Sequence, residues 1–416
     1  MRDAGLLPRV LKNLGKKSAG EVVTRAAAAA LYILAIRLLG ERGWGIFAFG
    51  LAYSGMWMAV ADLGLQQHLV RSVAPSHGSL RRTAGLVLGA KVWLGAAALV
   101  LALATARAAG FSGEQMTVVA LLVPAAVLQG WMDFYSSVTA SVERMEYDLL
   151  TRGGAKLFIA AAGLLVLARS PDPASFAAAI LAASCIAAAG VHAVLAGALG
   201  PLSPALSPKA WAPLLKKSLP VGLFFLFNAV YVRVDVTMLS WLGRGTEEVG
   251  WYGAASRIIE ISTVVPFLLS GATFPILADM RSRDPAGFRR LSRRLVGTAF
   301  GIGAAGALAG SLLASLLPAL LGEGFHESVR PFRILVFALP FAYGNFIAFT
   351  ILMADGASRP LVGLSALGAA LNVGANLLLI PRYGHVAAAA TTLATEAVVF
   401  ALACVRLRRL GRPVAA

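Results

Sequence analysis

The chain has 416 residues, of which 58% are hydrophobic and only 14% are charged. A soluble domain carries about 45–50% apolar and about 25% charged residues, so this chain has too little charge to cover a water-facing surface. The composition excludes a soluble globular enzyme, a disordered chain and a disulfide-stabilised secreted scaffold, and it predicts a polytopic membrane protein. The net charge of +17 would suggest a nucleic-acid partner in a soluble protein, so the positions of the basic residues matter.

Apolar windows of about 20 residues, the length that crosses a bilayer, recur along the whole chain. We predict an all-α integral membrane fold in which the windows form twelve transmembrane helices. Turn signals rich in Gly and Pro separate the windows, as at 40–43, 170–173 and 381–384. In chain order the windows are 18–39, 44–70, 83–106, 113–141, 150–168, 174–197, 214–242, 249–278, 292–317, 329–354, 359–380 and 384–405.

The basic residues are unevenly divided between the two sides of this topology. With the N-terminus placed inside, 24 of the 37 Lys and Arg residues fall in inner segments and 7 fall in outer loops. Cytoplasmic loops carry the excess of Lys and Arg in membrane proteins, which predicts that both termini are cytoplasmic. The net charge is then a consequence of topology, and no nucleic-acid partner is needed to explain it.

The longest polar connection, residues 199–212, divides the spans into six and six. We therefore predict an N-terminal six-helix lobe at 1–198, a cytoplasmic linker at 199–213 and a C-terminal six-helix lobe at 214–416. The halves resemble each other where their first and second helices meet, with LLG followed by GWG at 38–45 and WLG followed by GWYG at 241–253. Parallel repeats of this kind favour a transporter with a central cavity between two lobes.

The sequence contains no nucleotide-binding or metal-binding motif that would indicate a function other than transport. The sequence has no GxxxxGK[ST], no HExxH and no Cys/His cluster, so we predict no cofactor and no firm metal site. The pattern GIGAAG at 301–306 matches GxGxxG, but it lies inside an apolar helix. Close helix packing explains these glycines better than a dinucleotide site does.

Besides Arg37, which is three residues from Gly40 and can reach the outer interface, five basic residues lie inside predicted spans: Arg25, Lys91, Lys156, Arg233 and Arg257. Each would cost about 2.5–3.5 kcal/mol at a helix centre, so each must be paired, reach the interface or face water. Lys91 and Lys156 are near enough to the inner ends of their helices to reach the interface. The ion-pairing alternative for the deeper residues is Arg233 with Asp235 and Arg257 with Glu260.

Arg233 and Arg257 are predicted to lie near mid-membrane. Arg233 precedes Gly243 by ten residues and Arg257 follows Glu248 by nine, which places both about 13–15 Å below the outer loop. Guanidinium groups bind phosphates bidentately. A basic cavity therefore favours an anionic substrate such as a lipid-linked pyrophosphate, with all five basic residues as candidate ligands.

A second group of polar residues could couple transport to an ion gradient. Its members are oxygen-bearing side chains in apolar helices: Asp235, Asn372, Asn376, Thr392 and Glu396. One carboxylate with amide and hydroxyl oxygens can hold a monovalent cation such as Na⁺, for which Asp235, Asn372, Asn376 and Thr392 are the candidates. Alternatively Asp235 or Glu396 carries a proton, or Asn and Thr simply form interhelical hydrogen bonds.

Two stretches resemble a known family. RLLGE at 37–41 with WG at 44–45, DLGL at 62–65 and Arg71 resembles the first two helices of O-antigen flippases. RVD at 233–235, with GWY at 250–252, Arg257 and FP at 274–275, resembles their seventh and eighth helices. These proteins belong to the multidrug/oligosaccharidyl-lipid/polysaccharide (MOP) exporter superfamily, and the resemblance covers nearly the whole chain in length and span count.

The resemblance implies a Wzx-type flippase of the bacterial inner membrane, which moves an undecaprenyl-pyrophosphate-linked oligosaccharide by alternating access. It implies pyrophosphate binding by Arg25, Arg233 and Arg257, coupling to Na⁺ or H⁺, contact with membrane lipids, and polysaccharide polymerase and assembly proteins as partners. Two alternatives stay open. A cation-coupled multidrug antiporter would line its cavity with Asp62, Asp133 and Glu396. A membrane-embedded polysaccharide polymerase or ligase would need a large outer loop, and no predicted outer loop exceeds roughly 15 residues.

Overall fold

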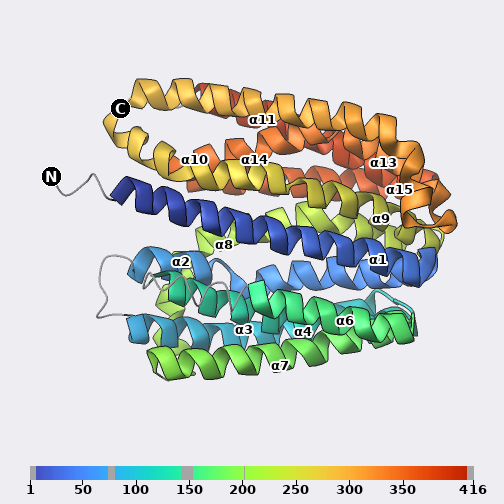
Figure 1. The fold of residues 1–416 in the computed structure, drawn as a ribbon, viewed down its shortest axis with the longest axis horizontal. Coiled ribbons are helices and arrows are strands. Elements are labelled where there is room, and N and C mark those ends of the chain that lie inside the picture. The colour runs from blue at the N-terminus through green and yellow to red at the C-terminus, as the bar shows by residue number, and fades with distance from the viewer. Residues whose placement is uncertain (1–5, 74–79, 142–152, 201, 410–416) are drawn as a thin grey trace.

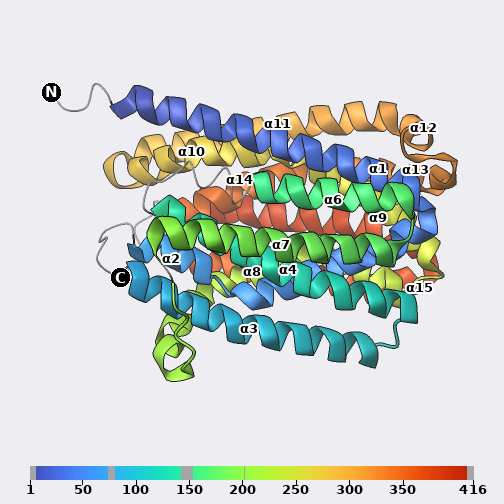
Figure 2. The same cartoon turned by 60° about the horizontal axis from the view of Figure 1, so that its bottom comes forward.

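The computed structural model describes residues 6–73, 80–141, 153–200 and 202–409. Every regular element in these ranges is a helix, and Figures 1 and 2 show the helices running side by side along one axis. This confirms the predicted all-α membrane fold. The helices of the first half are α1 Leu6–Asp62, α2 Leu65–Val73, α3 Leu80–Ala108, α4 Gly113–Ser141, α6 Ala155–Arg169 and α7 Pro173–Leu199.

The second half is also helical, with short 3₁₀ turns at Ala314–Leu316 and Glu323–Ser328. Within the described residues, eight helices are long and apolar enough to span a membrane, and α13 with α14 forms a further span bent by 50°. The helices of this half are α8 Pro208–Leu242, α9 Thr246–Ser262, α10 Val264–Arg283, α11 Pro285–Leu313, α12 Leu317–Leu321, α13 Val329–Val336, α14 Leu339–Ala354 and α15 Ser358–Arg408.

Two of the long helices contain two predicted spans each. α1 breaks at Gly40, where φ is 65°, and α15 breaks at Gly384, where φ is 58°. Glycine adopts this left-handed conformation without steric cost, so each helix ends there and the chain turns back. Figure 1 shows the dark-blue first arm of α1 and its lighter second arm. When the two arms of α1 and of α15 are counted separately, helices cover the predicted windows within the described residues. Residues 150–152 of the fifth window lie outside the described ranges, and α6 begins at Ala155.

The connection between α7 and α8 lies against α3. The Ala205 N–H donates to the Gly85 carbonyl oxygen at 2.9 Å, and the Trp93 indole N–H donates to the Leu206 carbonyl oxygen at 2.8 Å. A Cβ at Gly89 would overlap the carbonyl oxygen of Ala205. The glycines of α3 therefore let the linker backbone approach closely, and the linker is held by the first half of the chain.

The second arm of α1 connects the two halves. A Cβ at Gly45 would overlap the Thr246 carbonyl oxygen, and a Cβ at Gly250 would overlap that of Glu41, so α1 and α9 cross in backbone contact. At the other end of this arm, a Cβ at Gly222 of α8 would overlap the Leu63 carbonyl oxygen. The two repeated Gly-Trp segments seen in the sequence are therefore packed against each other.

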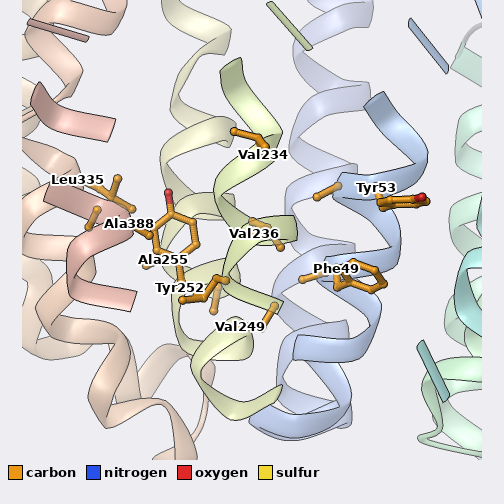
Figure 3. Close-up of a cluster of buried hydrophobic side chains, with 14 of the residues drawn as sticks. Phe49, Tyr53, Val234, Val236, Val249, Tyr252, Ala255, Leu335 and Ala388 are labelled. Carbon is orange, nitrogen blue, oxygen red and sulfur yellow. The ribbon is translucent and has the colours of Figure 1, made fainter. Parts of the chain in front are cut away.

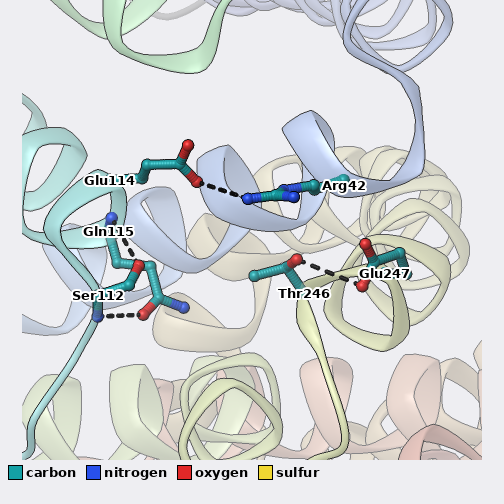
Figure 4. A network of polar contacts seen from close by, with 6 residues as sticks. All are labelled: Arg42, Ser112, Glu114, Gln115, Thr246 and Glu247. Atoms are coloured by element: carbon teal, nitrogen blue, oxygen red, sulfur yellow. Dashed lines mark hydrogen bonds and ion pairs between the residues drawn. The ribbon is translucent and has the colours of Figure 1, made fainter.

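A large hydrophobic cluster surrounds the α1–α9 crossing. Figure 3 shows Phe49 and Tyr53 of α1 on one side of α8 and α9, and Leu335 and Ala388 on the other. Polar contacts surround the same end of the bundle (Figure 4), including the exposed Arg42–Glu114 ion pair at 3.3 Å. The end of the bundle that carries Gly40 is thus tightly packed, whereas both termini lie at the opposite end (Figure 1).

Burial ends at the same level on both helices of the crossing. In α1, residues 44–54 are buried except at position 51, and residues 55–60 are only half-buried. In α9, residues 249–255 are buried except at position 251, and residues 256–262 are half-buried. α1 and α9 are therefore in close contact at the Gly40 end and less enclosed beyond it, whereas the far end of α1 meets α8 of the other half at Leu63.

The glycine-rich segment of α11 acts in helix packing. A Cβ at Gly303 would approach the Leu339 carbonyl oxygen, and Gly310 faces Val336. No atom of the described residues lies within 4 Å of a Cβ at Gly301, so this glycine does not pack closely against another helix. The structure supports the packing interpretation of 301–306 for part of the segment.

The α1–α9 crossing gives a direct stability test. We expect Gly45→Ala to lower the free energy of unfolding by about 1–3 kcal/mol, because the added methyl group must push two helix backbones apart. Gly301→Ala is the matched control, since its Cβ meets open space and alanine favours a helix by about 1 kcal/mol. Thermal unfolding in detergent measures both. Equal melting temperatures for the two variants would contradict the close approach.

Candidate functional site

Asp235 of α8 lies at the centre of a buried polar cluster. Its side chain is only 3% exposed, and it accepts three hydrogen bonds from other helices. Asn376 Nδ2 of α15 donates to Oδ1 at 2.6 Å, and the hydroxyls of Tyr252 and Thr392 donate to Oδ2 at 2.8 and 2.5 Å. α8, α9 and both arms of α15 thus meet at one carboxylate.

The amides beside Asp235 extend this cluster and leave atoms without partners. Asn376 Nδ2 also donates to Asn372 Oδ1 at 2.8 Å, one helical turn away. Asn376 Oδ1, Asn372 Nδ2 and the Thr391 hydroxyl are buried and have no hydrogen-bond partner in the described residues. Unpaired buried polar atoms are costly, so this cluster has the capacity to bind an additional polar species.

The structure brings Asp235, Asn372, Asn376 and Thr392 together, but it places Glu396 in a separate contact. Asn345 of α14 donates to Glu396 Oε2 at 2.7 Å and to its carbonyl oxygen at 3.0 Å. Sequence reasoning missed Tyr252 as a partner of Asp235. The available signal was its position in the GWYG segment at 250–253, which follows Asp235 on the next helix.

Arg257 is ion-paired within its own helix. Its Nη1 lies 2.5 Å from Glu260 Oε2, and its guanidinium carbon lies 4.5 Å from the centre of the Tyr32 ring. The ion-pairing alternative therefore describes Arg257. It does not describe Arg233, because the oxygens of Asp235 are occupied by Asn376, Tyr252 and Thr392.

Arg233 is half-buried and packs on the second arm of α1. A Cβ at Gly55 would meet the Arg233 guanidinium, so glycine leaves the space that this side chain occupies. No described carboxylate lies within ion-pairing distance of Arg233, in contrast to Arg257. Arg233 is thus a cation inside a predicted span whose charge is not neutralised by a described carboxylate.

The guanidinium groups of Arg233 and Arg257 do not lie at one depth. Tyr32, which Arg257 contacts, precedes Gly40 by eight residues, and Gly55, which Arg233 contacts, follows it by fifteen. At about 1.5 Å per residue these levels are about 12 and 22 Å from the turn. α8 runs toward the Gly40 end of the bundle and α9 runs away from it. Because side chains tilt toward the N-terminus of their own helix, the Arg233 side chain extends away from the Gly40 turn and the Arg257 side chain extends toward it.

The other predicted basic residues are distributed elsewhere. Lys91 of α3 is 3% exposed and lies 2.5 Å from Asp62 Oδ1, and Lys156 of α6 lies 3.9 Å from Asp133 Oδ1. Both contacts join helices of the first half. Arg25 falls in the first arm of α1, but its side chain lies outside the described residues. Asp62 and Asp133, which the antiporter alternative placed in the cavity, therefore face lysines.

An apolar groove of about 400 Å³ lies between α1, α3 and α8. Its lining includes Tyr53, Met56 and Trp57 of α1, and Val230, Met238 and Trp241 of α8. Trp241 is 55% exposed, so the groove reaches the bundle surface. Arg233 lies three residues after Val230, and positions three or four apart share a helix face. Arg233 is not itself a lining residue, but it lies on α8 between Val230 and Thr237, which both line the groove.

The fold, with its many long apolar helices, is that of a multi-pass membrane protein. A family profile described as "Polysaccharide biosynthesis protein" matches residues 10–281, and a second, described as "MatE", matches residues 220–378. The chain therefore belongs to the polysaccharide biosynthesis protein family, as the sequence resemblance predicted. No curated protein matches the sequence significantly.

Solved transporter structures share the fold. An inward-facing multidrug resistance MATE transporter of the MOP superfamily matches with a TM-score of 0.70 and 16% identity, covering 95% of this chain and 100% of that one. A Vibrio cholerae MATE transporter matches with a TM-score of 0.65 and 15% identity, covering 96% of each chain. The lipid II flippase MurJ in an inward closed conformation matches with a TM-score of 0.64 and 13% identity, covering 92% and 87%.

Two substitutions of Asp235 are expected to lower the free energy of unfolding by different amounts. We expect Asp235→Ala to lower the free energy of unfolding by about 3 kcal/mol or more, because three buried donors lose their acceptor. Asp235→Asn keeps the shape and one acceptor oxygen, so its loss is expected to be smaller. Thermal unfolding in detergent compares the two variants. A cluster that contributes nothing to stability would give both variants the melting temperature of the wild type.

Proposed function

We propose that this protein is a flippase for a lipid-linked oligosaccharide whose carrier bears a phosphate or pyrophosphate. The observation that supports this most is Arg233, a cation without a carboxylate partner in the described part of the chain. A charge inside a bilayer is stable only when it is paired or faces water. An anionic substrate group supplies that partner, and a guanidinium binds phosphate oxygens in a bidentate manner.

The groove beside Arg233 suits the lipid part of such a substrate. Its lining is largely aromatic and aliphatic, and it opens at the bundle surface beside Trp241. A volume of about 400 Å³ accommodates a segment of a polyprenyl chain, whose remainder would stay among the lipid tails. In this proposal Arg233 binds the charged head of the substrate and the groove binds its apolar tail, so adjoining parts of α8 recognise both.

We propose that transport proceeds by alternating access between the lobes 1–198 and 214–416, joined by a cytoplasmic linker at 199–213. The packed α1–α9 crossing at the Gly40 end and the greater exposure beyond residues 54 and 255 support an inward-facing state. In this scheme both termini are cytoplasmic, Arg233 receives the phosphate from the inner side, and separation of α1 from α9 opens the outer side.

Asp235 is proposed as the ion-coupling residue. Its carboxylate lies with the oxygens of Asn372, Asn376 and Thr392 from other helices, and Asn376 Oδ1 is buried without a partner. Such a set of oxygens suits Na⁺, and protonation of Asp235 is the other means of coupling. Glu396, held by Asn345, is a second possible proton carrier.

The cellular role that we propose is the transfer of O-antigen or another surface polysaccharide unit across the bacterial inner membrane, next to polysaccharide polymerase and assembly proteins. The second candidate function is a cation-coupled multidrug antiporter, which the MatE match over residues 220–378 favours. The pairing of Asp62 and Asp133 with lysines argues for the flippase, because it leaves these carboxylates without a free charge for a cationic drug.

Substitution of Arg233 tests the phosphate assignment. We expect Arg233→Ala to reduce flipping of a polyprenyl-pyrophosphate substrate roughly 10–100-fold, since a charge-assisted hydrogen-bonded pair is lost. Arg233→Lys should retain part of the activity. Complementation of a flippase-null strain at matched expression and flipping in proteoliposomes measure the effect. Arg107→Ala, at the exposed end of α3, is the control. Wild-type flipping by Arg233→Ala would exclude the assignment.

Imposed ion gradients test the role of Asp235. We expect flipping in proteoliposomes to respond to a Na⁺ or a proton gradient, and the response to disappear in Asp235→Asn because its carboxylate charge is removed. Glu396→Gln should keep the response to Na⁺. If Asp235→Asn responds to both gradients as the wild type does, coupling does not run through Asp235.

A further inference from the structure

A second pocket, of about 510 Å³, lies between the start of α11 and the end of α15. It shares no residue with the Asp235 cluster or with the apolar groove. Its basic lining residues are Arg289 and Arg293 of α11 and Arg408 of α15. These helix ends belong to the side of the bundle where the termini lie (Figure 1), which the charge distribution predicts to be cytoplasmic.

The polar groups of this pocket have no partners of their own. Within the described ranges, none of the three arginines has a carboxylate at ion-pairing distance, whereas nearby Arg281 pairs with Asp355. Ser292, which lines the pocket, is only 4% exposed, and its buried hydroxyl makes no hydrogen bond. An unpaired buried hydroxyl among free guanidinium groups indicates a site for an anionic, oxygen-rich ligand.

The other walls of the pocket are apolar. Phe288 and Val296 of α11 and Leu407 of α15 contribute to the lining. One helical turn further into the bundle, the rings of Phe300 and Phe400 stack with centroids 5.4 Å apart and close the space between the two helices. The pocket therefore has both basic and apolar walls near the helix ends, and only Val296 and Cys404 line it on the side of the bilayer core.

We propose that this pocket binds the headgroup phosphate of an anionic phospholipid from the adjoining leaflet. Basic pockets between transmembrane helices on the cytoplasmic side bind anionic headgroups in this way. The phosphate would lie among Arg289, Arg293 and Arg408 with a hydrogen bond from Ser292, while the glycerol and the first acyl carbons contact Val296 on the side of the bilayer core. A free phosphate offers the same charge, but it would leave this apolar wall uncovered.

The test compares two triple variants of the full chain with equal net charge. R289Q/R293Q/R408Q removes the pocket arginines, and the matched control R290Q/R294Q/R406Q removes exposed neighbours on the same helix ends that do not line the pocket. Phosphatidylglycerol is titrated into the detergent-solubilised protein, and bound lipid is counted by native mass spectrometry. Phosphatidylcholine and inorganic phosphate are titrated in parallel.

We expect the wild type and the control to bind phosphatidylglycerol in preference to phosphatidylcholine, and the pocket variant to bind it about tenfold or more weakly, because its charge-assisted hydrogen bonds are lost. Ser292→Ala should weaken binding by a smaller factor. Equal loss in both triple variants would show a diffuse basic surface and overturn the proposal. Displacement of the lipid by equimolar inorganic phosphate would overturn the lipid assignment in favour of a soluble phosphate.

Discussion

Polar groups inside a bilayer have no water to satisfy them, and this constraint accounts for most of the polar structure of the bundle. Lys91 faces Asp62 and Arg257 faces Glu260, so both of these charges within spans are neutralised by a neighbour. Asp235 follows the same rule by a different means, since amide and hydroxyl donors from two other helices surround its carboxylate. Arg233 is an exception, because no carboxylate of the described residues pairs with it. Its charge is therefore available to a partner from outside the chain.

The packing of the bundle depends on small residues at the positions where backbones meet. Without a hydrophobic driving force between helices in lipid, close van der Waals contact holds them together. Gly45 and Gly250 allow α1 and α9 to touch, and Gly222 allows α8 to touch the end of α1. Contacts of this type join the halves without interdigitated large side chains. Such an interface suits the separation of the halves that the proposed alternating access requires.

Much of the fold could be predicted from the sequence, because apolar length and glycine turns are local signals. The turns at Gly40 and Gly384 appeared as predicted. The side chains of Asp235, Asn372, Asn376 and Thr392 lie together, and ion binding by them stays a prediction. The depths of the guanidinium groups could not be predicted, since they depend on which way each side chain extends. The partner role of Tyr252 and the pocket between α11 and α15 also depend on packing between distant helices, which no local pattern records.

The attachment of the segment before α8 to α3 constrains how the molecule can bend. Because the backbone of Ala205 is hydrogen-bonded to Gly85 and the Leu206 carbonyl to Trp93, this stretch moves with the first half and cannot act as a slack tether. If the halves move relative to each other, the chain between them would bend within α8. Pro213 and Pro220 interrupt the hydrogen-bond ladder of this helix and lower the cost of a kink. α8 thus has a point of bending near its beginning and carries the proposed substrate and ion sites further along, so tilting this one helix would move both sites.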